Sequence, residues 1–175
     1  IRIAKGFEMN IIAYDKYPNK NLEKKLMFKY VSLQEIYSNS DIITLHIPFF
    51  KENYHMINKE TLNKMKKNSI LINTSRGELV DTKALLDSLS SGHLGGAGID
   101  VIEGESLIKE EKQLLHNLDT KSLKQLAQDH NLVRNEKVVF TPHIAFYSQE
   151  AIERILFTSI ENIKKAILYE AERQE

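Results

Sequence analysis

The sequence predicts a doubly wound α/β domain, in which helices cover a parallel sheet. Short apolar runs alternate with helical segments along most of the chain, as is typical of such folds. Within these runs apolar and polar residues do not alternate, which favours strands buried on both faces of the sheet. The runs are Ile11–Tyr14, Ile42–Leu45, Ile70–Ile72, Gly96–Ile99 and Val138–Phe140.

Three of the intervening helices carry start signals. Ser32 and Glu35 have the spacing of a capping box, in which each side chain bonds the backbone of the other residue. Two further helices are expected to end near Met65 and before Gly92, and their N-caps are Asn58 and Asp81.

The last part of the chain, 148–175, is expected to form one long amphipathic helix. A polar, Lys- and Leu-rich stretch, 106–136, interrupts the alternation before it, and we interpret this stretch as a surface insertion with a helical pattern. The apolar face of the final helix is formed by Ile152, Ile155, Leu156, Ile160, Ile163 and Ile167.

Composition excludes several classes of function. The 175 residues are 42% apolar and 27% charged, with a formal net charge of zero, so nothing suggests nucleic acid or an anionic membrane as a partner. The absence of cysteine excludes disulfides, thiolate metal sites and a cysteine nucleophile, and it fits a reducing cytoplasm. No apolar run approaches the roughly 18 residues of a membrane span. The six histidines show no metal-ligand spacing, so no metal site is expected.

The chain starts without methionine, on what we interpret as the tail of a helix, 1–7. Asp15 follows the first predicted strand. A carboxylate at this place in a dinucleotide-binding fold accepts the ribose hydroxyls and disfavours NADP, although an Asp that only starts a turn before Pro18 remains an alternative. The G-x-G-x-x-G fingerprint should precede Asp15 by about 20 residues, and it is absent because the sequence begins too late to contain it. We therefore expect an N-terminally truncated domain.

Three polar segments follow predicted strands: Asn73–Gly77, Gly98–Glu105 and Thr141–Ala145. They supply an arginine, carboxylates and a histidine at the strand ends where open α/β sheets bind ligands. The guanidinium of Arg76 is suited to bind a carboxylate through two parallel hydrogen bonds. His143, held after a strand and a proline, is suited to general acid–base work.

These segments resemble the D-specific 2-hydroxyacid dehydrogenase family, and within it the D-lactate dehydrogenase branch. The resemblance implies a Rossmann-like domain with NAD as cofactor, and hydride transfer between NADH and a small 2-oxo acid, most simply pyruvate. It implies that Arg76 binds the substrate carboxylate, that His143 is the general acid–base, and that Glu105 supports His143. Glu103 is the rival of Glu105. The family often has proline soon after this Glu, whereas Ser106 follows here.

The resemblance also implies the cofactor neighbours and the organisation of the chain. A partial dinucleotide-binding domain over 1–147 precedes the helix over 148–175, and the complete protein is expected to be a homodimer. Residues 1–175 alone are expected to be inactive. His46 is more simply a residue that satisfies its nitrogens locally than a catalyst. The cofactor neighbours, besides Asp15, are Ile47, Pro48, Asn53, Thr74, Ser75, Arg76, Asp100, His143 and Ala145.

Two alternatives remain at this stage. Dehydrogenases for hydroxyisocaproate, glycerate or phosphoglycerate share the same three residues, so the substrate is open. Some members of the family are NAD-sensing binding proteins, including transcriptional co-repressors, rather than enzymes. The presence of all three residues favours the enzyme.

Overall fold

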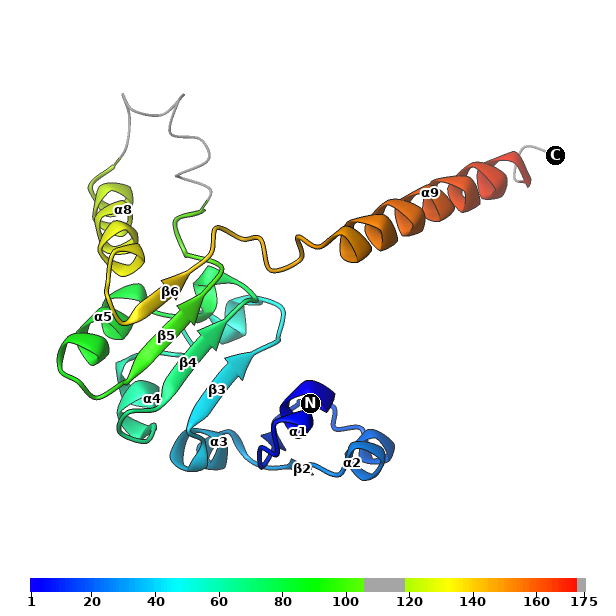
Figure 1. Ribbon diagram of the computed structural model, residues 1–175. Coiled ribbons are helices and arrows are strands. Elements are labelled where there is room, and N and C mark those ends of the chain that lie inside the picture. Colours follow the sequence, from blue (N-terminus) through cyan, green and yellow to red (C-terminus); the bar gives the residue numbers. More distant parts are fainter. Residues whose placement is uncertain (106–118, 173–175) are drawn as a thin grey trace. The chain divides into compact units, whose positions relative to one another are not determined.

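The computed structural model describes residues 1–105 and 119–172, and the side chains of these up to residue 169 (Figure 1). The chain divides into two compact units, Ile1–Thr141 and Pro142–Glu175. Each unit is therefore considered by itself.

A four-stranded parallel sheet forms the centre of the first unit (Figure 1). Its order is β3-β4-β5-β6, and parallel pairing continues across all four strands. The carboxyl ends of the strands therefore meet at one edge of the sheet. The strands are β3 (Ile42–Leu45), β4 (Ile70–Asn73), β5 (Gly96–Ile99) and β6 (Val138–Phe140).

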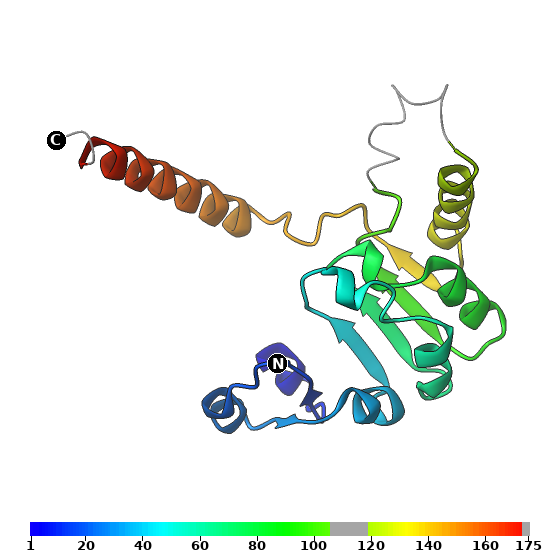
Figure 2. The same ribbon diagram turned by 180° about the vertical axis from the view of Figure 1, so that it is seen from behind.

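Four helices follow one another along this sheet, and each packs against the next. Figures 1 and 2 show α4, α5 and α8 on the same side of the strands. The core lies between this helical layer and the sheet. The four helices are α3 (Leu33–Asn39), α4 (Lys59–Lys64), α5 (Thr82–Ser90) and α8 (Thr120–Val133).

Burial alternates along the strands. Ile43 and Leu71 are buried, whereas their neighbours Ile42 and Ile70 are exposed, as is Val139 in β6. The expectation that the strands are buried on both faces is therefore wrong for the described residues. Apolar side chains occupy both faces, but this part of the chain supplies helices to only one of them.

The predicted helix starts are confirmed. Ser32 and Glu35 form the capping box of α3, and Asn58 caps α4. Asp81 caps α5 by accepting the backbone N–H of Ala84. These starts were predictable because each cap involves residues at most three positions apart.

The N-terminal elements form a second, two-stranded parallel sheet, β1-β2, apart from the first. The helical segment expected at the start of the chain is present, whereas the first strand has only two residues and its partner β2 was not predicted. The segment Phe28–Val31 has only four residues, and one of them is Lys29, so too few positions are present to show a strand pattern. The elements are α1 (Arg2–Gly6), β1 (Ile12–Ala13), α2 (Lys20–Leu26) and β2 (Lys29–Tyr30).

The stretch 106–136 was expected to be a surface insertion, but α8, which lies within it, is part of the packed domain. This helix connects β5 to β6, packs against α5, and contributes Leu132 to the core. The first part of the stretch, 106–118, lies outside the described residues, and so does the helical pattern predicted there.

The second unit consists of a connecting segment and α9 (Gln149–Glu172). The predicted apolar face of this helix is present, and it is exposed at Ile155, Ile160 and Ile163. No helix among the described residues combines the length and the apolar character that a membrane span requires.

Candidate active site

Asn73, the last residue of β4, shapes the turn that carries Arg76. Its buried side chain accepts the N–H of Ser75 at 3.0 Å and donates to the carbonyl of Arg76 at 2.8 Å. The hydroxyl of Ser75 donates to the carbonyl of Leu45 at 2.7 Å, which ties the turn to the end of β3. Arg76 itself is exposed, and its Nη1 donates to the carbonyl of Ser75. The backbone beneath the guanidinium is therefore fixed by three hydrogen bonds.

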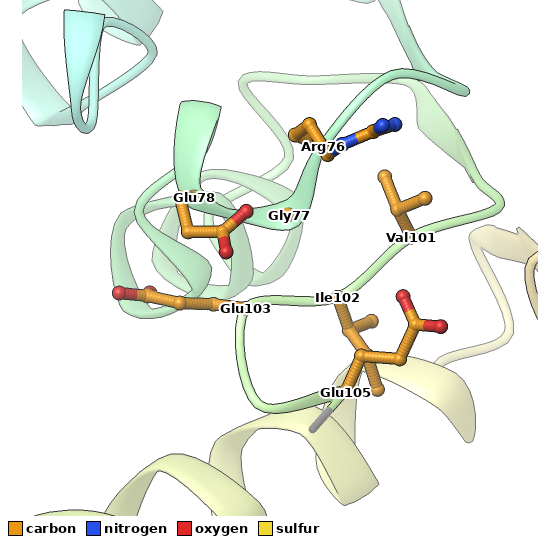
Figure 3. Close-up of a pocket in the computed structure, with 7 residues that line it drawn as sticks. All are labelled: Arg76, Gly77, Glu78, Val101, Ile102, Glu103 and Glu105. Carbon is orange, nitrogen blue, oxygen red and sulfur yellow. The ribbon is translucent and has the colours of Figure 1, made fainter. Parts of the chain in front are cut away.

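The loops after β4 and β5 line an open cavity of about 260 Å³ (Figure 3). Figure 3 shows the Glu105 carboxylate on the side of the loop where Arg76 lies, whereas the Glu103 side chain extends the other way. The cavity thus combines a guanidinium with a carboxylate from a neighbouring strand end. Its lining residues are Arg76, Gly77, Glu78, Val101, Ile102, Glu103 and Glu105.

Gly77 lets the two loops touch. A Cβ atom at this position would stand 2.1 Å from the carbonyl carbon of Ile102 and 2.3 Å from the nitrogen of Glu103. Both are backbone atoms, which cannot turn aside as a side chain can. The glycine of the Asn73–Gly77 motif is therefore a packing requirement of the cavity.

Glu103 binds two residues that the sequence analysis did not single out. Its Oε1 accepts the hydroxyl of Tyr54 at 2.6 Å, and its Oε2 lies 2.9 Å from Nε2 of His55. The rings of Tyr54 and His55 stack with their centroids 3.8 Å apart. The hydrogen bond to Glu103 is the main cause that raises the pKa of Tyr54 to about 12. No local pattern could have shown these contacts, because they join residues 48 and 49 positions apart.

Asp129 of α8 holds the next residue of the same loop. Its Oδ2 accepts the N–H of Gly104 at 3.1 Å, and its Oδ1 accepts Nε2 of Gln125 at 3.0 Å. Asp129 is fully buried, and burial raises its pKa to about 6 despite these hydrogen bonds. A Cβ on Gly104 would stand 2.4 Å from Oδ2, so this contact also requires glycine.

The segment that leads to His143 is tied to the end of β5. Thr141 donates its N–H to the carbonyl of Ile99 at 3.0 Å, and its hydroxyl donates to the buried Asp100 carboxylate. His143 has a φ of 56°, which is uncommon for a residue other than glycine and recurs at functional sites. His143 and Ala145 belong to the second unit, whereas the cavity is formed by residues of the first unit alone.

Two residues near the predicted cofactor path, Asp15 and His46, make contacts with residues two positions away. Oδ1 of Asp15 accepts the N–H of Tyr17 at 2.8 Å, which is the geometry of the alternative turn role. Nε2 of His46 lies 2.9 Å from the hydroxyl of Thr44, so the local interpretation of this histidine fits.

Asn53 closes the 3₁₀ turn η1 (Lys51–Asn53) by donating to the carbonyl of Pro48 and accepting the N–H of Phe50. Ile47 packs against the core, and Thr74 is exposed. Among the described residues no group of three His, Asp or Glu side chains could hold a metal ion.

Residues 1–145 match the sequence profile of the D-isomer specific 2-hydroxyacid dehydrogenase, NAD binding domain. The chain belongs to this family. A 2-hydroxyacid dehydrogenase homolog of Zymomonas mobilis is 44% identical over 161 residues, which are 92% of this chain and 47% of that protein. A D-lactate dehydrogenase of Treponema pallidum is 38% identical over 91% of this chain and 46% of its own length.

A solved structure supports the same assignment. The D-lactate dehydrogenase of Aquifex aeolicus, complexed with NAD and lactic acid, has a TM-score of 0.83 at 34% identity, covering 98% of this chain and 50% of that one. The fold is thus the Rossmann-like NAD-binding domain of 2-hydroxyacid dehydrogenases. The chain spans about half the length of the curated relatives it matches.

NAD is the cofactor of this domain, and the family acts on small 2-hydroxy and 2-oxo acids. The described residues fit a dinucleotide chemically, because Asp15 offers an exposed carboxylate just after β1. A buried carboxylate, Asp100, stands directly after β5 and accepts the hydroxyl of Thr141.

Proposed function

We propose that the complete protein is an NAD-dependent D-2-hydroxyacid dehydrogenase that reduces pyruvate to D-lactate. The observation that carries the proposal is the cavity between the β4 and β5 loops, which Arg76 and Glu105 both line. The arginine suits the carboxylate of a 2-oxo acid, whereas the Glu105 carboxylate serves His143 in this proposal rather than the substrate.

Arg76 binds the substrate carboxylate in this proposal. The planar guanidinium presents paired donors that match a carboxylate, and lysine does not reproduce this geometry. The fixed turn Asn73–Arg76 supports the role, because recognition with two parallel bonds requires a well-positioned base for the side chain.

His143 is the general acid of reduction, and Glu105 orients its ring and favours the protonated form. When bound, the nicotinamide supplies the hydride that the C2 carbonyl carbon accepts. His143 gives its proton to the carbonyl oxygen, so a hydroxyl forms, and in the reverse direction the neutral ring takes the proton back. Both oxygens of Glu103 are already bound by Tyr54 and His55, which supports Glu105 as the partner of His143.

Asp15 holds the adenosine ribose hydroxyls in this proposal and disfavours a 2′-phosphate. Asp100 lies beside the nicotinamide end. The other residues that contact the cofactor are Ile47, Pro48, Asn53, Thr74, Ser75, Arg76, His143 and Ala145. We further propose that the complete protein is a homodimer, as the resemblance implies, and that it is cytoplasmic, which fits the absence of cysteine. The proposed domain boundaries are those of a dinucleotide-binding domain over 1–147 and a helix over 148–175.

The test is a steady-state assay of the complete protein with NADH and a series of 2-oxo acids, with the chirality of the product determined. Pyruvate should be reduced to D-lactate. Preference for a longer 2-oxo acid or for glyoxylate would reassign the substrate within the family. NADH binding without turnover of any 2-oxo acid would favour the NAD-sensing alternative.

A further inference from the structure

Glu103 lies in the cavity wall, yet its carboxylate is directed to a different loop. Both of its oxygens are bound by Tyr54 and His55, which lie between β3 and α4. Its side chain is only 16% exposed, and that of His55 is 26% exposed. A carboxylate so enclosed and so fully engaged is suited to hold a loop rather than to meet a substrate.

The same short segment also holds the other wall of the cavity. The N–H of His55 donates to the carbonyl of Glu78 at 2.9 Å, and two residues later the N–H of Ile57 donates to the carbonyl of Leu79 at 3.0 Å. Glu78 and Leu79 belong to the 3₁₀ turn η2 (Gly77–Leu79), which directly follows Arg76. His55 thus contacts the Arg76 loop through its backbone and, together with Tyr54, contacts the Glu105 loop through Glu103.

The backbone of His55 is itself constrained. Its φ is 50°, in the left-handed region that side chains other than glycine rarely adopt. Its carbonyl accepts Nδ2 of Asn58, the N-cap of α4, at 3.0 Å. Surrounding structure must hold such a conformation in place, and conformations of this kind gather where side chains are placed for function.

We propose that Tyr54, His55 and Glu103 form a positioning cluster that sets Glu105 relative to Arg76, and that Glu103 acts on the reaction through Glu105. This inference rests on the function proposed above. Glu103 touches neither substrate nor cofactor in this account. Tyr54 remains a hydrogen-bond donor throughout the range of an enzyme assay, because the adjacent carboxylate keeps its hydroxyl protonated.

The test compares Tyr54→Phe and Glu103→Gln with the wild-type complete protein. Tyr54→Phe removes one hydroxyl and keeps the ring on His55. Tyr30→Phe is the matched control, since its ring contacts Phe28 and Lys20 in the other sheet region. The Glu103→Gln change should lower kcat/KM for pyruvate by about tenfold or more, and Tyr54→Phe by less, because small misplacements of reacting groups are costly. The KM for NADH and the Tyr30→Phe kinetics should be unchanged.

A double-mutant cycle separates positioning from general destabilisation. If Glu103 acts through Glu105, Glu103→Gln should change kcat/KM by less than about twofold in a Glu105→Gln background, since coupled residues are not additive. An equal loss of kcat/KM from Glu103→Gln in the wild-type and the Glu105→Gln backgrounds would overturn the inference. Wild-type kinetics in both Glu103→Gln and Tyr54→Phe would overturn it as well.

Hydrogen exchange tests the cluster without any activity. The amides of Gly104 and Glu105, which donate to Asp129 and Ile102, should exchange faster in Glu103→Gln and Tyr54→Phe than in the wild type. Unchanged exchange would show that the cluster does not hold the loop. A wild-type protein that reduces no 2-oxo acid but shows this faster exchange in the variants would refute the proposed function and leave the structural role of the cluster intact.

Discussion

The residues assigned to the substrate and those assigned to the cofactor are presented by the fold in different ways. Arg76 and Glu105 follow adjacent strands and line one cavity, whose walls touch through backbone atoms. Asp15 and Asn53 follow different strands and hydrogen-bond within their own turns. The substrate side is therefore preassembled by packing, whereas Asp15 and Asn53 on the cofactor side each belong to a separate turn. Single substitutions should accordingly have larger effects on the first side than on the second.

The largest expected effect is that of Gly77→Ala, which disrupts the contact between the loops after β4 and β5. The added methyl group would overlap the backbone of Ile102. We expect a loss of about 3 kcal/mol or more in the free energy of unfolding, measured by urea denaturation, because overpacking against backbone cannot be relieved by a rotamer change. Gly6→Ala is the control, since nothing lies within 4 Å of a Cβ there. Equal stability of the two variants would mean that the loops are not in contact.

Asp129 should make the stability of the substrate side depend on pH. Burial raises its pKa from the usual 3.8 to about 6, so the folded protein binds a proton that the unfolded chain releases between these values. Its favourable contribution is complete below about 3.8 and is lost as the pH rises through about 6.

Asparagine remains neutral, so the stability of Asp129→Asn relative to wild type should increase between pH 4 and pH 7, by an amount on the order of 3 kcal/mol. Denaturation of both proteins at the two pH values measures this difference. Asp119→Asn is a control with the opposite sign, because its pKa is lowered by the N–H of Ser122. A constant difference between wild type and Asp129→Asn would show that folding does not raise the pKa of Asp129.

Glu105→Gln tests the link between the preassembled cavity and His143. Reduction requires the protonated imidazole, so its rate declines at alkaline pH. Removing the carboxylate removes a charge that favours the protonated ring, and the alkaline limb of the kcat/KM profile for pyruvate should move to lower pH. If kcat/KM declined at the same alkaline pH in wild type and variant, the pairing of Glu105 with His143 would be excluded.

Asp15 should give the smallest of these effects, because it belongs to the cofactor side. Asp15→Ala should narrow the preference for NADH over NADPH by about tenfold, because it weakens the binding of NADH and relieves the repulsion of the 2′-phosphate of NADPH. Steady-state kinetics with both cofactors measures this ratio. A wild-type protein that prefers NADPH would show that Asp15 only starts the turn at Tyr17.

The sequence was informative wherever the deciding interaction is local. The caps at Asn58 and Asp81 involve neighbouring residues, and the Asn73–Gly77 motif contains the hydrogen bonds that shape its own turn. Three features were not predictable. The two-residue strand β2 is defined by its pairing with β1. Which face of the sheet is exposed depends on which helices are present. The cluster of Tyr54, His55 and Glu103 joins distant positions and leaves no periodic signal.

The most direct test of the account is the kinetics of Arg76→Lys in the complete protein, because the central claim is that the cavity binds the substrate carboxylate. The variant keeps the charge and loses the paired geometry. Arg134→Lys, at the end of α8, is the matched control. We expect kcat/KM for pyruvate to fall by about 30-fold or more in Arg76→Lys, with only a small change in the KM for NADH and wild-type values in the control. Unaltered pyruvate kinetics in Arg76→Lys, or an equal loss for NADH, would contradict the claim.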